Sequence, residues 1–253
     1  MGKIQTLPVS VINRIAAGEV VERPASVVKE LLENALDSGP TRIDADLEQG
    51  GIALIRIVDD GCGIEAEDLP LAVSPHATSK LRHADDLEDI KTLGFRGEAL
   101  ASIAEVSRVV IRTRTASGTG SRLEVDGGLN RGIIPEGCRR GTSVEVHQLF
   151  SKIPARRAFL KTPATEWSHS SEAFVKTAIA HPEIAFSLTH NRRRVHELPA
   201  VDDWRQRIAD LYGSQLADRL LYAKEVDDDI SVTALVGRPE DDMASGRFQH
   251  FFI

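Results

Sequence analysis

The segment from Val27 to Gly39 constrains the fold more than any other part of the chain. At about 100° per residue its apolar side chains fill one half of a helical wheel, which predicts an amphipathic helix packed on a core. Pro24 suits the first turn of this helix, and Gly39 after Ser38 suits its end, because glycine adopts the left-handed conformation without strain. The apolar positions are Val27, Val28, Leu31, Leu32, Ala35 and Leu36.

The other half of this helix carries a polar stripe. Glu30 and Asn34 are four residues apart and lie one above the other, and Asp37 follows on the same side. Taken alone, two acids and an amide on one face are typical of a solvated surface. They become candidates for catalysis or ligand binding if neighbouring segments add further polar groups.

A β-hairpin is predicted after the helix. Residues 42–48 alternate between polar and apolar, residues 49–51 read as a tight turn, and residues 52–59 form the second strand. Counted by twos, the face that carries Asp59 also carries Ala53, Ile55 and Ile57. Since an unpartnered buried carboxylate is costly, Asp59 either accepts hydrogen bonds from a ligand or simply ends the strand and starts the turn.

Two glycine-containing segments follow. Gly61 and Gly63 would let the backbone approach a flat ligand. The run 94–97 leads into residues 98–103, which predict a helix start, and the free amide groups of such a start suit phosphate. The polar residues 76–89 between the two segments form either a mobile lid or an ordinary surface connection.

The remaining sequence predicts further strands and helices, with a domain boundary near Pro199 to Asp203. Because the chain stops on the apolar run 251–253 without a cap, we expect it to be a fragment that ends inside a second domain. Strands are expected at 106–115, 121–125, 141–146, 184–189, 195–198 and 230–236, and helices at 12–20 (ending at Gly18), 172–181 and 204–212.

Composition limits the class of protein. The 253 residues are 42% hydrophobic and 27% charged, and no apolar run is long enough to span a membrane, so we expect an intracellular globular protein. The net charge of −7 argues against a surface that binds nucleic acid all over. Cys62 and Cys138 are predicted to be reduced packing residues. Local basic clusters, which are either DNA contacts or solvated surface, lie at 139–140, 156–161 and 192–194.

Four motifs together resemble the ATPase superfamily of DNA gyrase, the large heat-shock chaperones, histidine kinases and MutL. They are Glu30-x-x-x-Asn34, Asp59-x-Gly61-x-Gly63, Gly94-Phe95-Arg96-Gly97-Glu98-Ala99-Leu100 and Gly141-Thr142. Within this superfamily, residues 15–24, 94–103 and Pro154-Ala155-Arg156-Arg157 before residues 159–161 are similar to MutL-type mismatch-repair proteins.

The resemblance implies roles for the motif residues. Glu30 would be the general base that activates the water attacking the γ-phosphate, Asn34 would bind Mg²⁺, and Asp59 would accept a hydrogen bond from the adenine amino group. Thr142 would support Asp59, and Asp60 departs from the asparagine that the family often has there. The remaining nucleotide contacts would come from Gly61, Gly63, Thr78, Ser79, Lys80, Gly94, Phe95, Arg96, Gly97, Glu98, Ala99 and Leu100.

The resemblance also implies the architecture and the function. Residues 1–202 would be an ATP-binding domain with an α+β, two-layer (Bergerat-type) fold, and residues 203–253 would begin a truncated second domain with a ribosomal-protein-like α/β fold. ATP with Mg²⁺ would order the lid and drive homodimerisation of the full-length protein, timing its action on the DNA backbone with a MutS-like mismatch-recognition protein and downstream repair factors. It would be cytoplasmic in a bacterium, or nuclear in a eukaryote.

The fragment is expected to be a monomer with weak hydrolysis, because the family's γ-phosphate lysine comes from the second domain. The alternatives are a nucleotide-responsive DNA-binding scaffold without significant hydrolysis, and the ATPase region of a type II topoisomerase.

Overall fold

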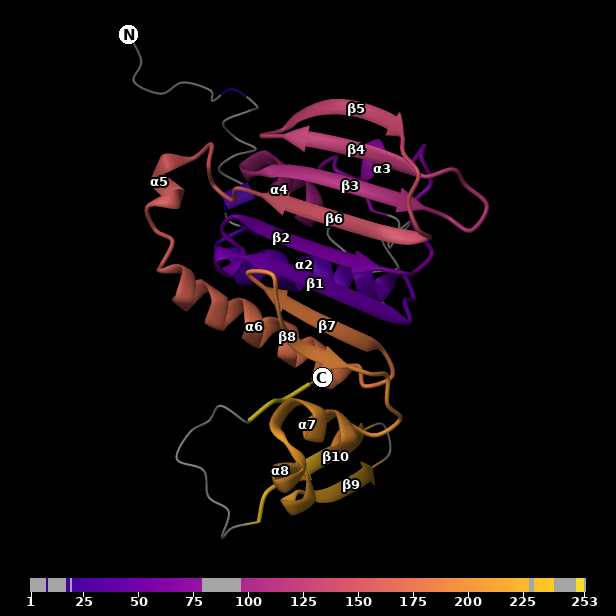
Figure 1. The fold of residues 1–253 in the computed structure, drawn as a ribbon, viewed down its shortest axis with the longest axis vertical. Helices are drawn as coiled ribbons and strands as arrows, with labels where there is room; N and C mark the ends of the chain where they lie inside the picture. The colour runs from indigo at the N-terminus through magenta and orange to yellow at the C-terminus, as the bar shows by residue number, and fades with distance from the viewer. Residues whose placement is uncertain are drawn as a thin grey trace.

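The fold is built on one eight-stranded mixed sheet with helices on one face (Figure 1). The structure is a computed structural model, and it describes residues 8, 17, 18, 20–78, 97–227, 230–238 and 249–252. The strand order is β5-β4-β3-β6-β2-β1-β7-β8, and only β1 and β7 pair in parallel. This arrangement confirms the expected α+β, two-layer fold.

The strands of the large sheet are β1 (Arg42–Glu48), β2 (Leu54–Asp59), β3 (Arg108–Arg114), β4 (Ser121–Asp126), β5 (Leu129–Pro135), β6 (Gly141–His147), β7 (Ala185–His190) and β8 (Arg193–Leu198). The helices are α2 (Pro24–Asp37), α3 (Leu69–Ala72), α4 (Ala99–Val106), α5 (Pro154–Arg157), α6 (Pro163–Ala180), α7 (Trp204–Tyr212) and α8 (Ser214–Arg219), with a 3₁₀ turn, η1, at Gln49–Gly51. A separate hairpin pairs β9 (Leu221–Asp227) with β10 (Ile230–Val236).

Helix α2 forms the centre of the core, as its pattern predicted. Its predicted apolar positions are buried except Leu36, which is partly buried, and Pro24 occupies its first turn. Gly39 follows the helix with φ = 67°, the left-handed conformation expected after the last turn. Figure 1 shows α2 and α4 behind the sheet, and no helix of the described part of the chain covers its opposite face.

Hydrogen bonds from two arginines hold the segment before α2 in place. Arg23 donates to both carboxylate oxygens of Glu166 on α6 at 3.3 Å, and Glu166 is only 1% exposed. Arg156 on α5 donates to the backbone oxygens of Gly18 and Val21. A Cβ at Gly18 would lie 1.9 Å from the guanidinium of Arg156. Arg156 therefore has a structural role in holding the segment before α2.

Ion pairs cover the open face of the sheet. Arg112 on β3 contacts Glu136 at 2.6 Å and Glu145 at 2.7 Å. Arg42 on β1 contacts Asp44 at 2.8 Å and Glu197 at 2.9 Å. Because these arginines already have acidic partners, they do not form a basic surface for nucleic acid.

The structure corrects several sequence expectations. Of the helix expected at 12–20, only residues 17, 18 and 20 are described, and Gly18 is itself helical; the rest lie outside the described residues. Strand β5 was missed because it is an exposed edge strand without polar–apolar alternation, and α8 and β9 were missed as well. Helix α6 begins at Pro163, nine residues earlier than expected, and Cys62 is exposed rather than packed. Helix α7 has the predicted bounds.

Arg207 connects α7 to the turns around β7 and β8. Its side chain is fully buried and donates to the carbonyl oxygens of Pro182, Ile184 and Pro199 at 2.7–3.0 Å. The expected division into domains 1–202 and 203–253 stays a prediction. In the described part of the chain, no helix has the length and apolar character needed to cross a membrane.

Candidate nucleotide-binding site

Asp59 lies at the end of β2 in the middle of the sheet and is 8% exposed. Ile55 and Ile57 on its face are buried, whereas Arg56 between them is exposed, which confirms the predicted alternation. The carboxylate is therefore held at the edge of the apolar core that α2 covers.

The two carboxylate oxygens of Asp59 have different surroundings. Oδ1 accepts hydrogen bonds from the backbone N–H of Gly61 at 3.0 Å, from Ser38 Oγ at 3.0 Å and from the backbone N–H of Thr142 at 3.3 Å. Among the described residues, no donor reaches Oδ2. One oxygen is thus fixed by the protein, and the other is left to accept a hydrogen bond from a ligand.

Burial raises the pKa of Asp59 above its usual value. The hydrogen bonds from Gly61, Ser38 and Thr142 oppose this effect, and the nearby charge of Asp60 adds to it. A ligand donor at Oδ2 would stabilise the ionised carboxylate, because hydrogen bonds to the charged form favour it.

Thr113 on β3 extends this polar cluster and was not predicted from the sequence. Its hydroxyl donates to the carbonyl oxygen of Gly141 at 3.1 Å and accepts from the backbone N–H of Ile64 at 2.8 Å. It also lies 3.1 Å from the hydroxyl of Thr142. The hydroxyl proton of Thr113 can go to Gly141 or to Thr142, so either threonine hydroxyl can be the donor between them.

Two glycines allow the backbone segments around Asp59 to meet. Gly141 has φ = 104°, and a Cβ there would lie 2.0 Å from the carbonyl oxygen of Asp59. Gly63 has φ = 77°, and a Cβ there would lie 2.4 Å from the carbonyl oxygen of Arg114. A side chain at Gly141 would push β6 away from Asp59, and one at Gly63 would push the glycine loop away from the end of β3.

Asp60 has a structural role that separates it from Asp59. It accepts hydrogen bonds from the backbone N–H of Thr41 at 2.7 Å, the backbone N–H of Arg42 at 2.9 Å, and the Thr41 hydroxyl. Burial raises the pKa of Asp60, but these hydrogen bonds outweigh it and leave the pKa below its usual value. The second carboxylate therefore fixes the start of β1 and does not compete for the ligand.

The polar stripe of α2 ends beside this cluster, at the C-terminal end of the helix. Glu30, Asn34 and Asp37 are all partly accessible, in contrast to the buried apolar side of the helix. The C-cap residue of α2, Ser38, is the one that contacts Asp59. Helix α2 thus joins the predicted catalytic and metal-binding side chains to the predicted adenine-binding carboxylate.

The helix start predicted at residues 98–103 is present as α4. The helix begins at Ala99, with Glu98 as its N-cap residue. A Cβ at Gly97 would lie 2.5 Å from the carbonyl oxygen of Ala77, and His76 Nδ1 lies 3.0 Å from Glu98 Oε1. Gly97 and Glu98, at the start of α4, therefore lie beside His76 and Ala77, the first residues of the predicted lid.

Residues 19–147 match the family described as histidine kinase-, DNA gyrase B-, and HSP90-like ATPases. The chain belongs to this ATPase family.

Within the family, the chain matches MutL. It is 43% identical to the DNA mismatch repair protein MutL of Anaeromyxobacter sp. (strain K) and 45% identical to that of Heliobacterium modesticaldum, over 100% of this chain in both cases. Only 42% and 39% of those proteins are covered, so the chain spans about two fifths of their length. This ATPase is thus the ATP-binding region of a MutL-type protein.

Solved structures agree with this assignment. The Aquifex aeolicus MutL ATPase domain complexed with ADP matches with a TM-score of 0.68 and 29% identity, covering 88% of this chain and 80% of that one. A structure described as the N terminal domain of a DNA repair protein matches with a TM-score of 0.72 and 25% identity, covering 85% of this chain and 64% of that one.

Two groups of predicted nucleotide contacts are described in the structure of this ATPase. Gly61, Gly63 and Thr142 belong to the group around Asp59, and residues 97–100 form the group at the start of α4. Thr78 is described and exposed beside the second group. Ser79, Lys80, Gly94, Phe95 and Arg96 lie outside the described residues. Ser38 and Thr113 were missed, because their contacts depend on segments that are distant in sequence.

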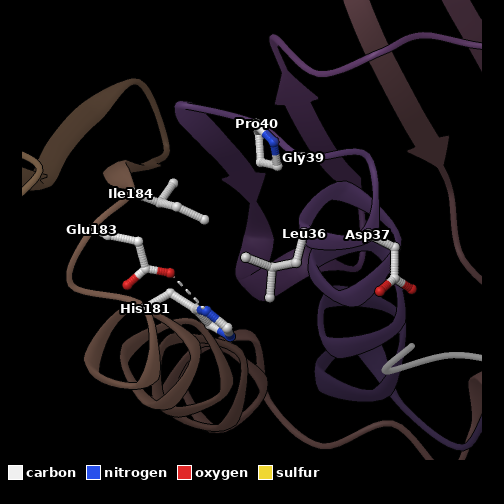
Figure 2. Close-up of a pocket in the computed structure, with 7 residues that line it drawn as sticks. All are labelled: Leu36, Asp37, Gly39, Pro40, His181, Glu183 and Ile184. Carbon is white, nitrogen blue, oxygen red and sulfur yellow. Dashed lines mark hydrogen bonds and ion pairs between the residues drawn. The ribbon is translucent and has the colours of Figure 1, made fainter. Parts of the chain in front are cut away.

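A separate cavity of about 440 Å³ lies between the end of α2 and the turn that joins α6 to β7 (Figure 2). Leu36 and Ile184 form part of the apolar wall, and His181 Nδ1 lies 3.2 Å from Glu183 Oε1. Figure 2 shows Asp37 on the side of α2 opposite to Leu36. Asp37 also lines the cavity, whereas Ser38, Asp59 and Thr142 do not, so the cavity is distinct from the cluster around Asp59.

Proposed function

We propose that this ATPase region binds ATP with the adenine at Asp59 and the phosphates between α2 and the start of α4. The observation that carries this proposal is the difference between the two carboxylate oxygens of Asp59. Oδ1 accepts hydrogen bonds from three protein donors, whereas no described donor reaches Oδ2. An adenine amino group is a donor that suits Oδ2. The hydroxyl of Thr142, which can donate or accept, suits a water or a second polar group of the base.

Glu30 is proposed as the general base, because a carboxylate on the accessible side of α2 can orient and activate a water at the γ-phosphate. Asn34, one turn further along, is proposed to hold Mg²⁺ through its amide oxygen, and the ion would neutralise phosphate charge. The described residues contain no group of three His, Cys, Asp or Glu side chains that could hold a metal ion. The phosphates would supply further oxygen ligands to the ion.

The biological role follows from the MutL match. We propose that nucleotide binding orders the predicted lid at residues 76–89 and the segment before α2, which promotes homodimerisation of the longer protein, and that slow hydrolysis reverses it. This cycle would time contacts with the DNA backbone, a MutS-like mismatch-recognition protein and downstream repair factors in the bacterial cytoplasm. Residues 203–253 are proposed to begin a second domain.

The test is calorimetric titration with a non-hydrolysable ATP analogue, with and without Mg²⁺, using inorganic triphosphate as the adenine-free control. We expect saturable binding that requires the adenine and is weakened without Mg²⁺. Asn34→Ala should lose the Mg²⁺ dependence, and Glu30→Gln should bind the analogue normally but lose ATP turnover. Equal turnover in Glu30→Gln and the wild type would refute the role of Glu30, and equal affinity for triphosphate and the analogue would refute the adenine site.

A further inference from the structure

Ser38 occupies the junction between the helix that carries Glu30 and the loop that carries Asp59. It is the C-cap residue of α2, and its hydroxyl lies 3.0 Å from Asp59 Oδ1 and 2.7 Å from the carbonyl oxygen of Ala35. Its own carbonyl oxygen accepts a hydrogen bond from the backbone N–H of Cys62 at 3.0 Å. Ser38 therefore contacts both the catalytic helix and the glycine loop.

The close packing at this junction depends on Gly61. A Cβ at Gly61 would lie 1.8 Å from Ser38 Oγ and 2.7 Å from its carbonyl oxygen. The loop can approach the helix end only because this residue has no side chain. As a result, the Ser38 hydroxyl is within hydrogen-bond distance of the Asp59 carboxylate.

The hydroxyl proton of Ser38 has two acceptors and can serve one at a time. The Ala35 carbonyl is neutral, whereas Asp59 is charged when ionised, and hydrogen bonds to a charged acceptor are roughly twice as strong. With Asp59 ionised, the proton therefore goes to Oδ1. This bond is the only one of the three at Oδ1 that comes from a side chain.

We propose that Ser38 is a positioning residue for purine recognition, which holds Oδ1 of Asp59 so that Oδ2 is presented to the exocyclic amino group of adenine. This inference rests on the proposed ATP-binding function. A 6-oxo purine carries an acceptor where adenine carries the amino donor, so a correctly oriented carboxylate rejects it. Ser38 thereby contributes to discrimination between ATP and inosine triphosphate without contacting the phosphates.

The test compares Ser38→Ala with the matched control Thr41→Ala, which removes a hydroxyl donor from the neighbouring carboxylate Asp60. Steady-state hydrolysis of ATP and inosine triphosphate is measured for both variants and the wild type, with thermal unfolding to check the fold. For Ser38→Ala we expect the KM for ATP to rise about tenfold, as for the loss of one charge-assisted hydrogen bond. The kcat should change little, and the preference for ATP should fall by the same factor.

Thr41→Ala should keep the ATP preference of the wild type. An unchanged preference in Ser38→Ala, or an equal loss in both variants, would overturn the role of Ser38 while the ATP site stands. A loss confined to kcat would also overturn it, because a general disturbance of α2 would act through Glu30. A wild type that shows no preference for ATP would instead overturn the adenine site and this inference with it.

Discussion

Replacing Asp59 by Asn tests the adenine site most directly, because it preserves the shape of the side chain and changes only its charge and one acceptor. The amide oxygen can take the place of Oδ1 and keep the three donors from Ser38, Gly61 and Thr142. The amide NH₂ then occupies the position of Oδ2 and faces the adenine amino group, so that two donors oppose each other. The loss of a hydrogen bond to a charged acceptor and the unpaired donors together cost about 3 kcal/mol. We therefore expect the Kd for ATP to rise by a factor of about 150.

The same substitution is expected to leave the free protein as stable as the wild type, or to stabilise it, at pH 7. Burial raises the pKa of Asp59, so the native state binds more protons than the unfolded state between the ordinary and the raised pKa. The free energy of unfolding of the wild type therefore decreases as the pH rises through this window, and Asp59→Asn removes this decrease. Thermal unfolding between pH 4 and pH 7 measures the difference.

Asp60→Asn is the matched control, and its expected effect on the free energy of unfolding has the opposite sign. The pKa of Asp60 is lowered, so its ionised form stabilises the fold above the usual Asp pKa, and this contribution is lost as the pH falls through the lowered value. Asp60→Asn should lower the free energy of unfolding at pH 7 and leave the affinity for ATP unchanged. The reasoning is refuted if Asp59→Asn binds ATP within threefold of the wild type, or if Asp60→Asn loses as much affinity.

Three further substitutions test contacts that support the site. Glu166→Ala should lower the free energy of unfolding by about 3 kcal/mol, because it leaves a half-buried arginine without its partner; a loss below 1 kcal/mol in urea denaturation would contradict this. Gly18→Ala should lower the melting temperature by colliding with Arg156, and adding Arg156→Ala should restore part of the loss; purely additive effects would exclude the contact. Gly141→Ala should weaken ATP binding by separating β6 from Asp59, whereas Gly137→Ala, whose Cβ meets no atom within 4 Å, should bind ATP like the wild type.

The sequence predicted the site where local periodicity carries the information. The alternation in β2 was enough to assign Asp59 to the buried face, and the helical spacing in α2 was enough to separate its polar stripe from its core side. Both patterns reflect a single element packing against one core, so no knowledge of distant segments was needed.

The parts that sequence analysis missed depend on contacts between distant segments or on exposed structure. The Thr113 hydroxyl bonds to Ile64 and Gly141, which are 49 and 28 residues away, so no short motif contains the cluster. Strand β5 is exposed along its whole length, so burial does not impose alternation on its sequence. Cys62 was expected to pack in the core, but the loop turns its side chain outward.

The pairing of β2 with β6 has a consequence for how the protein acquires its affinity for nucleotide. Asp59 and Thr142 are direct neighbours in this ladder although 83 residues separate them along the chain. Such a long loop must close before the two residues meet, and non-local pairings of this kind form slowly. We therefore expect nucleotide affinity to emerge late during refolding. ATP should therefore slow unfolding without accelerating folding, because it binds a site that is not yet formed in the transition state.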